Sequence, residues 1–163
     1  MSLETGLSGR VVIVTGAAAG IGYATAMGFA KEKCRVAAWD VSDAKAAEIV
    51  SALSAAGGDA VFQKVDVANP ASVTEAVAAT VAKWGRVDVL VNNAGIVRDA
   101  LLVKWKDGAQ AGMMTNEGFD QVIDVNLRGP FLCTRAVVPH MIRAGGGAIL
   151  NASSVVGLYG NFG

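Results

Sequence analysis

The turn at residues 15–22 (TGAAAGIG) holds three glycines and no bulky side chain, directly after the first short apolar run of the chain. Glycine lets a chain turn tightly and lets backbone N–H groups approach a pyrophosphate closely. A helix that begins at such a turn adds unpaired N–H groups and the positive end of its dipole. The spacing is G-x-x-x-G-x-G rather than G-x-G-x-x-G, so an ordinary tight loop is the alternative. The predicted phosphate-binding residues are Gly16, Ala18, Gly20, Ile21 and Gly22.

An acid, Asp40, ends the second apolar run, eighteen residues after Gly22. A dinucleotide-binding fold places at this position the carboxylate that hydrogen-bonds a ribose diol. A carboxylate repels a 2′-phosphate, and the glycine turn carries no Lys or Arg to neutralise one. We therefore expect NAD(H) as the cofactor rather than NADP(H). The alternative is that Asp40 only caps the next helix together with Ser42.

Polar and small residues also follow the third and fourth apolar runs. Asp66 ends the third run, and Asn92-Asn93-Ala94-Gly95 ends the fourth. Ligands of open α/β sheets bind at the carboxyl ends of the strands, so we expect these residues at the same site. An Asn pair can also simply hold a turn. The predicted cofactor-binding residues outside the glycine turn are Asp40, Val41, Asp66, Val67, Asn93, Ala94 and Gly95.

The elements that must position these residues follow from the hydrophobic pattern. Short β-branched runs alternate with stretches of helical periodicity, which is typical of βαβ units around a buried parallel sheet. The predicted strands are residues 10–15, 35–40, 60–66, 87–92 and 147–153. The predicted helices are residues 21–32, 42–56, 69–84 and 117–144. Ser42 and Asn69 are predicted N-caps, Pro70 lies in a first turn, and Gly57 or Gly85 is a stop. The fold class is α/β, a Rossmann-type doubly wound parallel sheet in a single domain over residues 1–163.

Composition excludes other classes of function. The chain has 163 residues, 53% of them hydrophobic, and its 14 basic residues balance 14 acidic ones, so nothing favours nucleic acid or an anionic membrane as a partner. No stretch approaches the roughly 18 apolar residues of a membrane span, and residues 1–10 do not resemble a secretory signal, so we expect a cytoplasmic protein. Cys34 and Cys133 lack metal-ligand spacing, which predicts buried free thiols and no metal site.

Taken in order along the chain, the motifs resemble those of the short-chain dehydrogenase/reductase family. They are TGAAAGIG, Asp40, Asp66-Val67, NNAG at residues 92–95, Asp124-Val125-Asn126 and Ser153-Ser154. The similarity runs from Arg10 to the last residue. Residues 154–157 (SVVG) and 160–163 (GNFG) are most similar to the 3-oxoacyl-(acyl-carrier-protein) reductase branch.

The resemblance implies hydride transfer between a nicotinamide ring and a small-molecule carbonyl or alcohol substrate. It gives catalytic roles to Asn126, which matches the family's Asn in DVN, and to Ser154, which matches the Ser that hydrogen-bonds the substrate oxygen. The family's acid/base Tyr and its Lys, in Tyr-x-x-x-Lys, have no counterpart here. We therefore expect the cofactor-binding part of such an enzyme, truncated after the fifth strand and inactive by itself. Tyr159 is no substitute, because no neighbouring Lys lowers its phenol pKa from about 10.

A second hypothesis is a naturally shortened protein that binds a dinucleotide or a partner chain without catalysis. In either case strand 147–153 would be an open edge and helix 117–144 would expose an apolar face, which predicts association or aggregation of a chain of this length. By resemblance, the full-length protein is a homo-oligomer, a tetramer or dimer, in which the long helix packs against a neighbouring subunit.

Pro130 lies four residues after Asn126 and has no N–H, so the carbonyl of Asn126 loses its helical partner. In the resembled family this Asn interrupts its helix, and its main chain holds a water that leads to the catalytic Lys. An ordinary proline kink is the alternative.

The segment 98–115 is predicted to be a loop or partial helix near the site, because such long connections are usually functional. Its Trp105 and Met113-Met114 are candidates for a substrate mouth. Trp39 and Trp84 are expected to pack in the core or at a helix end. His140, the only histidine, has no second metal ligand nearby and is predicted to be structural. No oxyanion-type turn supports a thiol–imidazole pair of His140 with Cys133.

Overall fold

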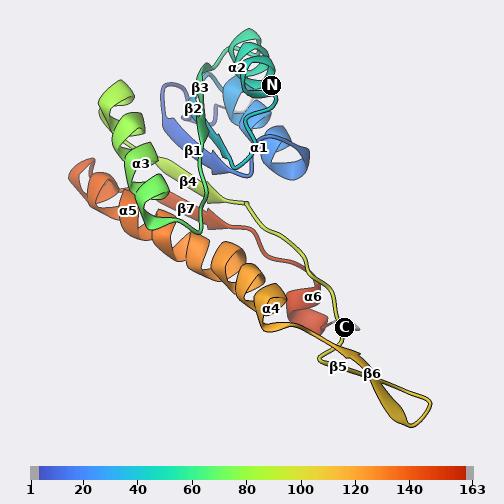
Figure 1. Ribbon diagram of the computed structural model, residues 1–163. Helices are drawn as coiled ribbons and strands as arrows, with labels where there is room; N and C mark the ends of the chain where they lie inside the picture. The colour runs from blue at the N-terminus through green and yellow to red at the C-terminus, as the bar shows by residue number, and fades with distance from the viewer. Residues whose placement is uncertain (1–3, 161–163) are drawn as a thin grey trace.

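The five predicted strands form one parallel sheet in the computed structural model, which describes residues 4–160 (Figure 1). Their bounds are β1 Val11–Thr15, β2 Arg35–Asp40, β3 Asp59–Lys64, β4 Val89–Asn92 and β7 Ala148–Asn151. The order across the sheet is β3-β2-β1-β4-β7, and β1 pairs in parallel with both β2 and β4. The chain thus changes its direction of travel across the sheet after β3, as in a doubly wound fold. The predicted fold class is confirmed, with strand ends that differ by up to two residues.

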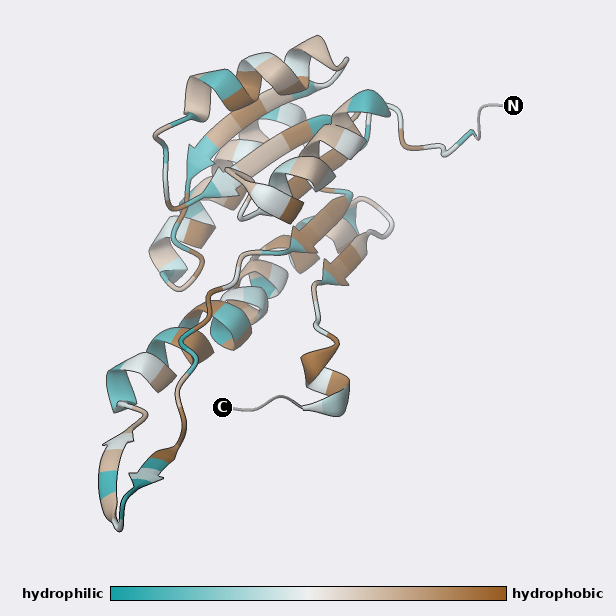
Figure 2. Ribbon diagram, turned by 90° about the vertical axis from the view of Figure 1, so that its right-hand side faces the viewer, coloured by the Kyte–Doolittle hydropathy of each residue, from teal (hydrophilic) through white to brown (hydrophobic). Residues whose placement is uncertain are grey.

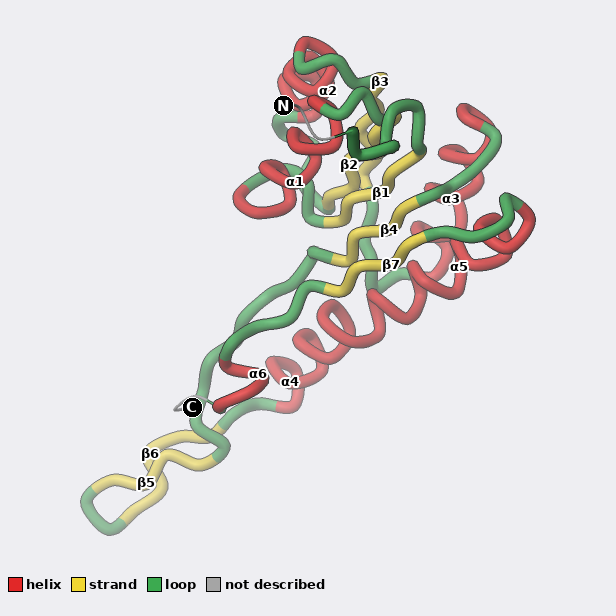
Figure 3. The backbone as a smooth tube through the Cα atoms, turned by 180° about the vertical axis from the view of Figure 1, so that it is seen from behind, coloured by secondary structure: helices red, strands yellow, loops and turns green. Residues whose placement is uncertain are grey.

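Helices cover both faces of this sheet (Figures 1 and 3). On one face α1 (Gly20–Lys31) and α2 (Ala46–Ala55) pack over Val12 and Val14 of β1. On the other face α3 (Pro70–Trp84) and α5 (Gly129–Arg143) pack over Val11 and Ile13. All five residues of β1 are therefore buried, which explains why its sequence is a continuous apolar run and does not alternate. The strands are accordingly mostly hydrophobic in Figure 2.

The start of α3 was predictable from its cap, and the start of α2 was not. The Asn69 side chain accepts hydrogen bonds at the start of α3, Pro70 occupies its first turn, and Gly85 ends it with φ +80°. The prediction that Ser42 caps α2 is wrong, because α2 begins four residues later and its cap position, Lys45, makes no side-chain hydrogen bond. The N–H of Ser42 instead donates to Asp40.

The long helix predicted at residues 117–144 is divided into three segments. They are α4 (Asn116–Ile123), the π-helix η1 (Asp124–Arg128) and α5. The N–H of Gly129 donates to the carbonyl of Asp124, five residues earlier, which is the hydrogen bond of a π-helix. Because Pro130 has no N–H to donate, the regular helical ladder cannot continue through this point. The prediction of a single helix over residues 117–144 is therefore corrected, and the interruption considered at Asn126 is present.

Segment 98–115 forms a hairpin, so the prediction of a loop or partial helix is also corrected. Its strands are β5 (Val103–Lys106) and β6 (Ala109–Met113), which pair antiparallel. The turn between them is Asp107-Gly108, with φ +52° and +79°, as a two-residue type I′ hairpin turn requires. The hairpin extends beyond α4, away from the sheet (Figures 1 and 3). A further short helix, α6 (Val156–Tyr159), follows β7.

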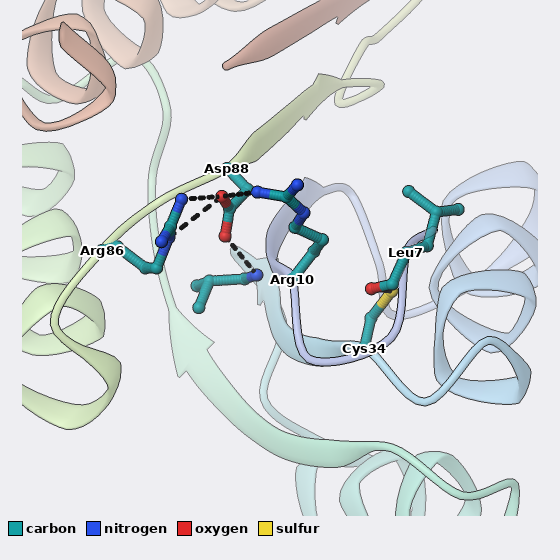
Figure 4. Close-up of polar contacts among 6 residues, drawn as sticks. Leu7, Arg10, Cys34, Arg86 and Asp88 are labelled. Carbon is teal, nitrogen blue, oxygen red and sulfur yellow. Dashed lines mark hydrogen bonds and ion pairs between the residues drawn. The ribbon is translucent and has the colours of Figure 1, made fainter. Parts of the chain in front are cut away.

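One buried carboxylate, Asp88, holds together the end of the sheet at which the parallel strands β1 and β4 begin (Figure 4). It accepts hydrogen bonds from Arg10 at 3.0 Å, from Arg86 at 2.6 Å and from the N–H of Val11 at 2.9 Å. Burial alone would raise the pKa of Asp88, but these hydrogen bonds and the charge of Arg86 together hold that pKa below its ordinary value. This cluster fixes β1 against β4 at the end opposite the candidate site.

The two cysteines are buried free thiols, as the sequence predicts. Cys34 donates to the carbonyl of Leu7 (Figure 4), and burial, with the charges of Glu32 and Asp88, raises its pKa to about 11. Burial raises the pKa of Cys133 to about 12. Across residues 4–160, no helix is both long enough and apolar enough to cross a membrane.

Candidate active site

Two neighbouring cavities open where β1, β2, β4 and β7 end. The first has a volume of about 230 Å³. It is lined by Gly16, Asp40, Val41, Val65, Asp66, Val67, Ala94, Gly95, Ile96 and Val125. The second has a volume of about 740 Å³ and is lined by residues after β4 and β7 and by η1 and α5. Ala94 and Gly95 line both cavities. Seven of the twelve predicted cofactor-binding residues thus line the first cavity, and Asn93 lines the second.

The glycine turn packs against the end of β4 and leaves no room for a side chain at Gly16 or Gly22. Gly16 has φ +67°, and a Cβ added to it would lie 3.0 Å from the Cα of Ala94. A Cβ added to Gly22 would collide with the carbonyl oxygen of Gly16. The predicted Ala18, Gly20, Ile21 and Gly22 lie in this turn and the first turn of α1, beside the cavities and not in their lining.

The beginning of α1 suits an anion. No side chain caps the helix, whose N-cap residue is Ala19, and no acidic residue lies in its first turn. The first N–H groups of a helix have no intrahelical partner, and they lie at the positive end of its dipole. The arrangement can therefore bind a phosphate through the backbone.

Asp40 connects the end of β2 to the glycine turn. Its Oδ2 accepts a hydrogen bond from the N–H of Ala18 at 2.9 Å, and its Oδ1 accepts one from the N–H of Ser42 at 3.0 Å. The capping alternative does not hold, because α2 begins only at Ala46. A carboxylate offers about four acceptor sites, so both oxygens keep one for a ribose hydroxyl.

Asn93 holds the end of β4 against β1. Its side-chain amide donates to the carbonyl of Thr15 at 3.0 Å, and the N–H groups of Asn93 and Ala94 donate to the Thr15 hydroxyl at 3.0 and 2.9 Å. This is the turn-holding role given as the alternative for the Asn pair. Thr15 lies outside the predicted site residues, although a hydroxyl directly before the first glycine of the turn was a visible signal. It is 1% exposed and joins the two strands whose ends form the first cavity.

The Asn126 side chain binds the segment that follows β4. Its Oδ1 accepts from the N–H of Ile96 at 2.9 Å, and its Nδ2 donates to the carbonyl of Ile96 at 2.8 Å. Asn126 lies within η1, where Pro130 removes the N–H that would otherwise bind its carbonyl. The side chain thus positions the strand end, and the irregular helix sets the direction of the Asn126 main chain.

Ser154 lies after β7 and lines the second cavity together with Asn126. Its residue surface is exposed, and its Oγ accepts a hydrogen bond from the N–H of Val156 at 3.4 Å. The two predicted catalytic residues therefore come together at one cavity. Residues 161–163, part of the predicted resemblance, lie outside the described residues.

Other predicted candidates lie elsewhere. Trp105 and Met113 are 68% and 57% exposed on the hairpin, and neither they nor Met114 lines the two cavities. Trp39 and Trp84 are buried, as predicted. His140 lies in a groove between α3 and α5, and within residues 4–160 no three His, Cys, Asp or Glu side chains gather as metal ligands.

Comparison with known proteins gives the class of protein that this fold and these cavities define. A family model described as short chain dehydrogenase matches residues 10–163. The 3-oxoacyl-[acyl-carrier-protein] reductase FabG of Thermotoga maritima is 45% identical over 155 residues, which cover 95% of this chain and 59% of that protein. The 3-oxoacyl-[acyl-carrier-protein] reductase of Synechocystis is 41% identical over 158 residues, which cover 96% of this chain and 60% of that protein.

A third relative is named for a different activity. The 2,5-dichloro-2,5-cyclohexadiene-1,4-diol dehydrogenase LinX of Sphingobium indicum is 35% identical over 153 residues, covering 94% of this chain and 58% of that protein. The chain therefore belongs to the short-chain dehydrogenase family, a family of oxidoreductases, and is most similar to its 3-oxoacyl-[acyl-carrier-protein] reductases. It spans about three fifths of the length of these relatives.

Proposed function

We propose that the protein is an NAD(H)-dependent oxidoreductase that transfers hydride between a nicotinamide ring and a carbonyl or alcohol substrate. The observation that carries this proposal is the pair of adjacent cavities. One is bordered by the glycine turn and Asp40, and the other holds Asn126 and Ser154. A dinucleotide bound across both cavities would have its adenosine ribose at Asp40 and its nicotinamide ring beside Ser154.

The residues present fit such a cofactor. The glycine turn is closely packed at Gly16 and Gly22, and the uncapped start of α1 offers N–H groups to a pyrophosphate. Asp40, already fixed by Ala18 and Ser42, presents its remaining acceptor sites to the ribose diol. When bound, the nicotinamide supplies or accepts the hydride, and the residues of this chain only bind and orient it.

The preference for NAD(H) rests on charge. Asp40 places a carboxylate at the ribose end, and residues 16–22 carry no Lys or Arg. A 2′-phosphate at this position would face an unneutralised negative charge in a partly buried setting, where Coulomb repulsion is poorly screened. The carboxylate therefore discriminates against NADP(H) by repulsion and favours NAD(H) by hydrogen bonding.

We propose reduction of a 3-oxoacyl thioester as the reaction. The names of the two reductase relatives support this substrate, and the cavity of about 740 Å³ has room for it. Ser154 would donate its hydroxyl hydrogen to the substrate carbonyl oxygen, and the Asn126 main chain would order water nearby. Neither tyrosine of residues 1–163 is followed by Lys at the fourth position. The proposal therefore assigns proton transfer to a Tyr and Lys outside these residues.

Turnover assays of the whole protein test this function. NADH consumption with a 3-oxoacyl thioester should fall about 100-fold or more in Ser154→Ala, because a transition-state hydrogen bond is lost, and NADH affinity should not change. Ser51→Ala, on the exposed side of α2, is the matched control and should retain full activity. Equal activity of Ser154→Ala and the control would overturn the catalytic assignment.

The second candidate function is dinucleotide binding without catalysis, for which the glycine turn and Asp40 are sufficient. The same assays separate it from the first. Tight NADH binding by the whole protein without turnover of any carbonyl or alcohol would support the binding protein. The absence of binding to either dinucleotide would exclude both functions.

A further inference from the structure

The side chain of Trp39 is buried directly before the carboxylate that the proposed function places at the ribose. Trp39 precedes Asp40 in β2, is 0% exposed, and packs on the face of the sheet that α3 and α5 cover (Figure 1). The indole N–H can only donate a hydrogen bond, and no water reaches it at this depth. It therefore needs an acceptor from the protein itself.

Gln63 supplies this acceptor. It is the register partner of Trp39 on β3, and its Oε1 accepts a hydrogen bond from Trp39 Nε1 at 2.6 Å. Because the indole nitrogen is only a donor, the Gln63 amide must present its oxygen to Trp39, and its NH2 group then faces α3. There Nε2 donates to the carbonyl of Ala76 at 3.1 Å. The two neighbours together determine the orientation of the Gln63 amide.

Thr80, four residues after Ala76, completes this buried hydrogen-bond network. Its hydroxyl oxygen lies 2.9 Å from Gln63 Oε1 and 2.8 Å from the carbonyl oxygen of Ala76. The single hydroxyl hydrogen can be donated to either oxygen, so Thr80 keeps a partner whether or not Gln63 is present. The indole of Trp39 has no such alternative, since within residues 4–160 its N–H bonds only to Gln63.

The network is supported by a helix and a strand that are joined at a second point. Trp84, at the end of α3, donates from its Nε1 to Oδ2 of Asp59 at 2.7 Å. Asp59 begins β3, and Gln63 lies near the other end of this strand. Two hydrogen bonds between α3 and β3 thus fix the helix along the strand. Trp39 is held against regular secondary structure and not against a loop.

The main chain at Trp39 leads from this network to the glycine turn. The carbonyl of Trp39 accepts a hydrogen bond from the N–H of Ala17 at 3.0 Å. The carboxylate of the next residue, Asp40, accepts one from the N–H of Ala18 at 2.9 Å. A shift of β2 at Trp39 would therefore move the turn and the carboxylate together.

We propose that Gln63 is a positioning residue for the dinucleotide. By pairing the indole of Trp39 it fixes Asp40 and the glycine turn, and thereby sets the preference for NADH over NADPH. The inference rests on the proposed function for its ligand. Gln63 lines neither of the two cavities, so it acts through Trp39 and not by contact with the cofactor. Gln63, Trp39 and Thr80 all lie outside the motifs that resemble the short-chain dehydrogenases.

Gln63→Met, of similar size, tests this role because it leaves the buried indole N–H without an acceptor. In the whole protein we expect the dissociation constant of NADH to rise about tenfold and that of NADPH to rise less. A displaced carboxylate loses its directional hydrogen bonds to the ribose and also repels a 2′-phosphate less. The preference for NADH, expressed as the ratio of the two constants, should fall at least about threefold.

Val77→Ala is the matched control for a loss of stability alone. Val77 is 3% exposed on α3 and belongs to the same core cluster as Trp39. A substitution that only lowers the folded fraction weakens both dinucleotides by the same factor, so the ratio of the two constants should stay unchanged. An unchanged ratio in Gln63→Met, or an equal fall in Val77→Ala, would overturn the proposal.

A double-mutant cycle tests whether Gln63 acts through the indole. Trp39→Phe removes the same hydrogen bond from the other side. The double variant Trp39→Phe/Gln63→Met should therefore lose no more of the preference for NADH than Gln63→Met alone. Losses that multiply in the double variant would mean that the two residues act independently and would contradict the assigned route.

Hydrogen exchange of the cofactor-free whole protein separates this inference from the proposed function. Peptides that contain Ala17 and Ala18 should exchange at least about tenfold faster in Gln63→Met, relative to peptides of β4, and at the original relative rate in Val77→Ala. If the original protein binds neither dinucleotide, the proposed function fails, and exchange still decides whether Gln63 holds the turn. Equal exchange in Gln63→Met and the original protein would overturn the positioning role.

Discussion

The Asp40 carboxylate holds the glycine turn through its hydrogen bond from the N–H of Ala18, and it also discriminates between NADH and NADPH. Substitutions can separate these two roles. Asp40→Asn keeps an oxygen that can accept from Ala18 but removes the charge. We expect it to weaken NADH binding about tenfold and to improve NADPH binding, since the repulsion is lost. Asp40→Ala also releases the glycine turn and should weaken binding of both dinucleotides. Dissociation constants for NADH and NADPH provide the measurement.

Removal of a charge elsewhere is the control for Asp40→Asn. Glu48→Gln, at an exposed position of α2, removes one negative charge without touching the glycine turn and should leave both dissociation constants unchanged. An unchanged ratio of NADH to NADPH affinity in Asp40→Asn would show that Asp40 does not face the ribose.

The lowered pKa of Asp88 should make the free energy of unfolding depend on pH. Its pKa is held below its ordinary value, so the folded state favours the charged carboxylate. This stabilisation is present above the unfolded pKa of about 3.9 and is lost as the pH falls below it through the folded pKa. Asp88→Asn should lower the free energy of unfolding at pH 7 by about 2 kcal/mol, since Arg10 and Arg86 lose their shared charged acceptor.

Urea unfolding at pH 7, 5 and 3 measures this effect. The difference between the original chain and Asp88→Asn should be constant from pH 7 to pH 5 and should shrink at pH 3. A difference that stays the same at pH 3 would mean that the carboxylate of Asp88 is not preferentially charged in the folded state.

Among the elements, the helix through η1 departs from regular α-helical hydrogen bonding beside the candidate active site. Pro130→Ala restores an N–H that can donate to the carbonyl of Asn126 and lets the helix become regular. We expect the free energy of unfolding to rise by about 1 kcal/mol and kcat of the whole protein to fall several-fold, because Asn126 shifts relative to Ile96.

A second proline of the same helix is a matched control for this change. Pro139 lies inside α5, away from both cavities, so Pro139→Ala should also raise stability but leave kcat unchanged. Equal effects of the two substitutions on kcat would argue that the π-helix has no role in positioning Asn126.

How far each element could be predicted depends on how local its causes are. The strands, the glycine turn and the Asn69 cap follow from short sequence signals, and they are confirmed. The start of α2 was not predictable because no side chain caps it, since the cap residue Lys45 makes no side-chain hydrogen bond. The Asp107-Gly108 turn was a visible hairpin signal, outweighed by the length of segment 98–115 and by its mixture of charged and apolar residues.

The residues of the candidate site likewise divide into those that the sequence predicts and those that depend on contacts between distant segments. Residues that line a cavity through their place at a strand end, such as Asp66 and Gly95, were predictable from topology. The hydrogen bonds of Asn93 to Thr15 and of Asn126 to Ile96 join segments distant in sequence, so no local pattern indicates them. The π-helical form of residues 124–128 follows from Pro130, but an interior proline is equally compatible with a simple kink.

At the scale of the whole molecule, the sheet ends at β7, whose outer side has no partner strand in residues 4–160. Ile149 packs into the core, whereas Leu150 points to the opposite face and is 49% exposed. A bare strand edge with an apolar side chain pairs readily with other chains. We therefore expect residues 1–163, produced alone, to associate into oligomers whose size increases with protein concentration.

Leu150→Lys should suppress this growth, because an edge lysine opposes strand pairing, and light scattering over a range of concentrations measures it. Ile149→Lys is the contrasting variant and should unfold the chain, since its side chain is packed into the core. Pairing of β7 with the same edge of a second copy closes at a dimer, whereas pairing of β7 with the outer edge of β3 continues without limit. Both products should be lost in Leu150→Lys, and a discrete monomer of residues 1–163 at every concentration would contradict edge pairing.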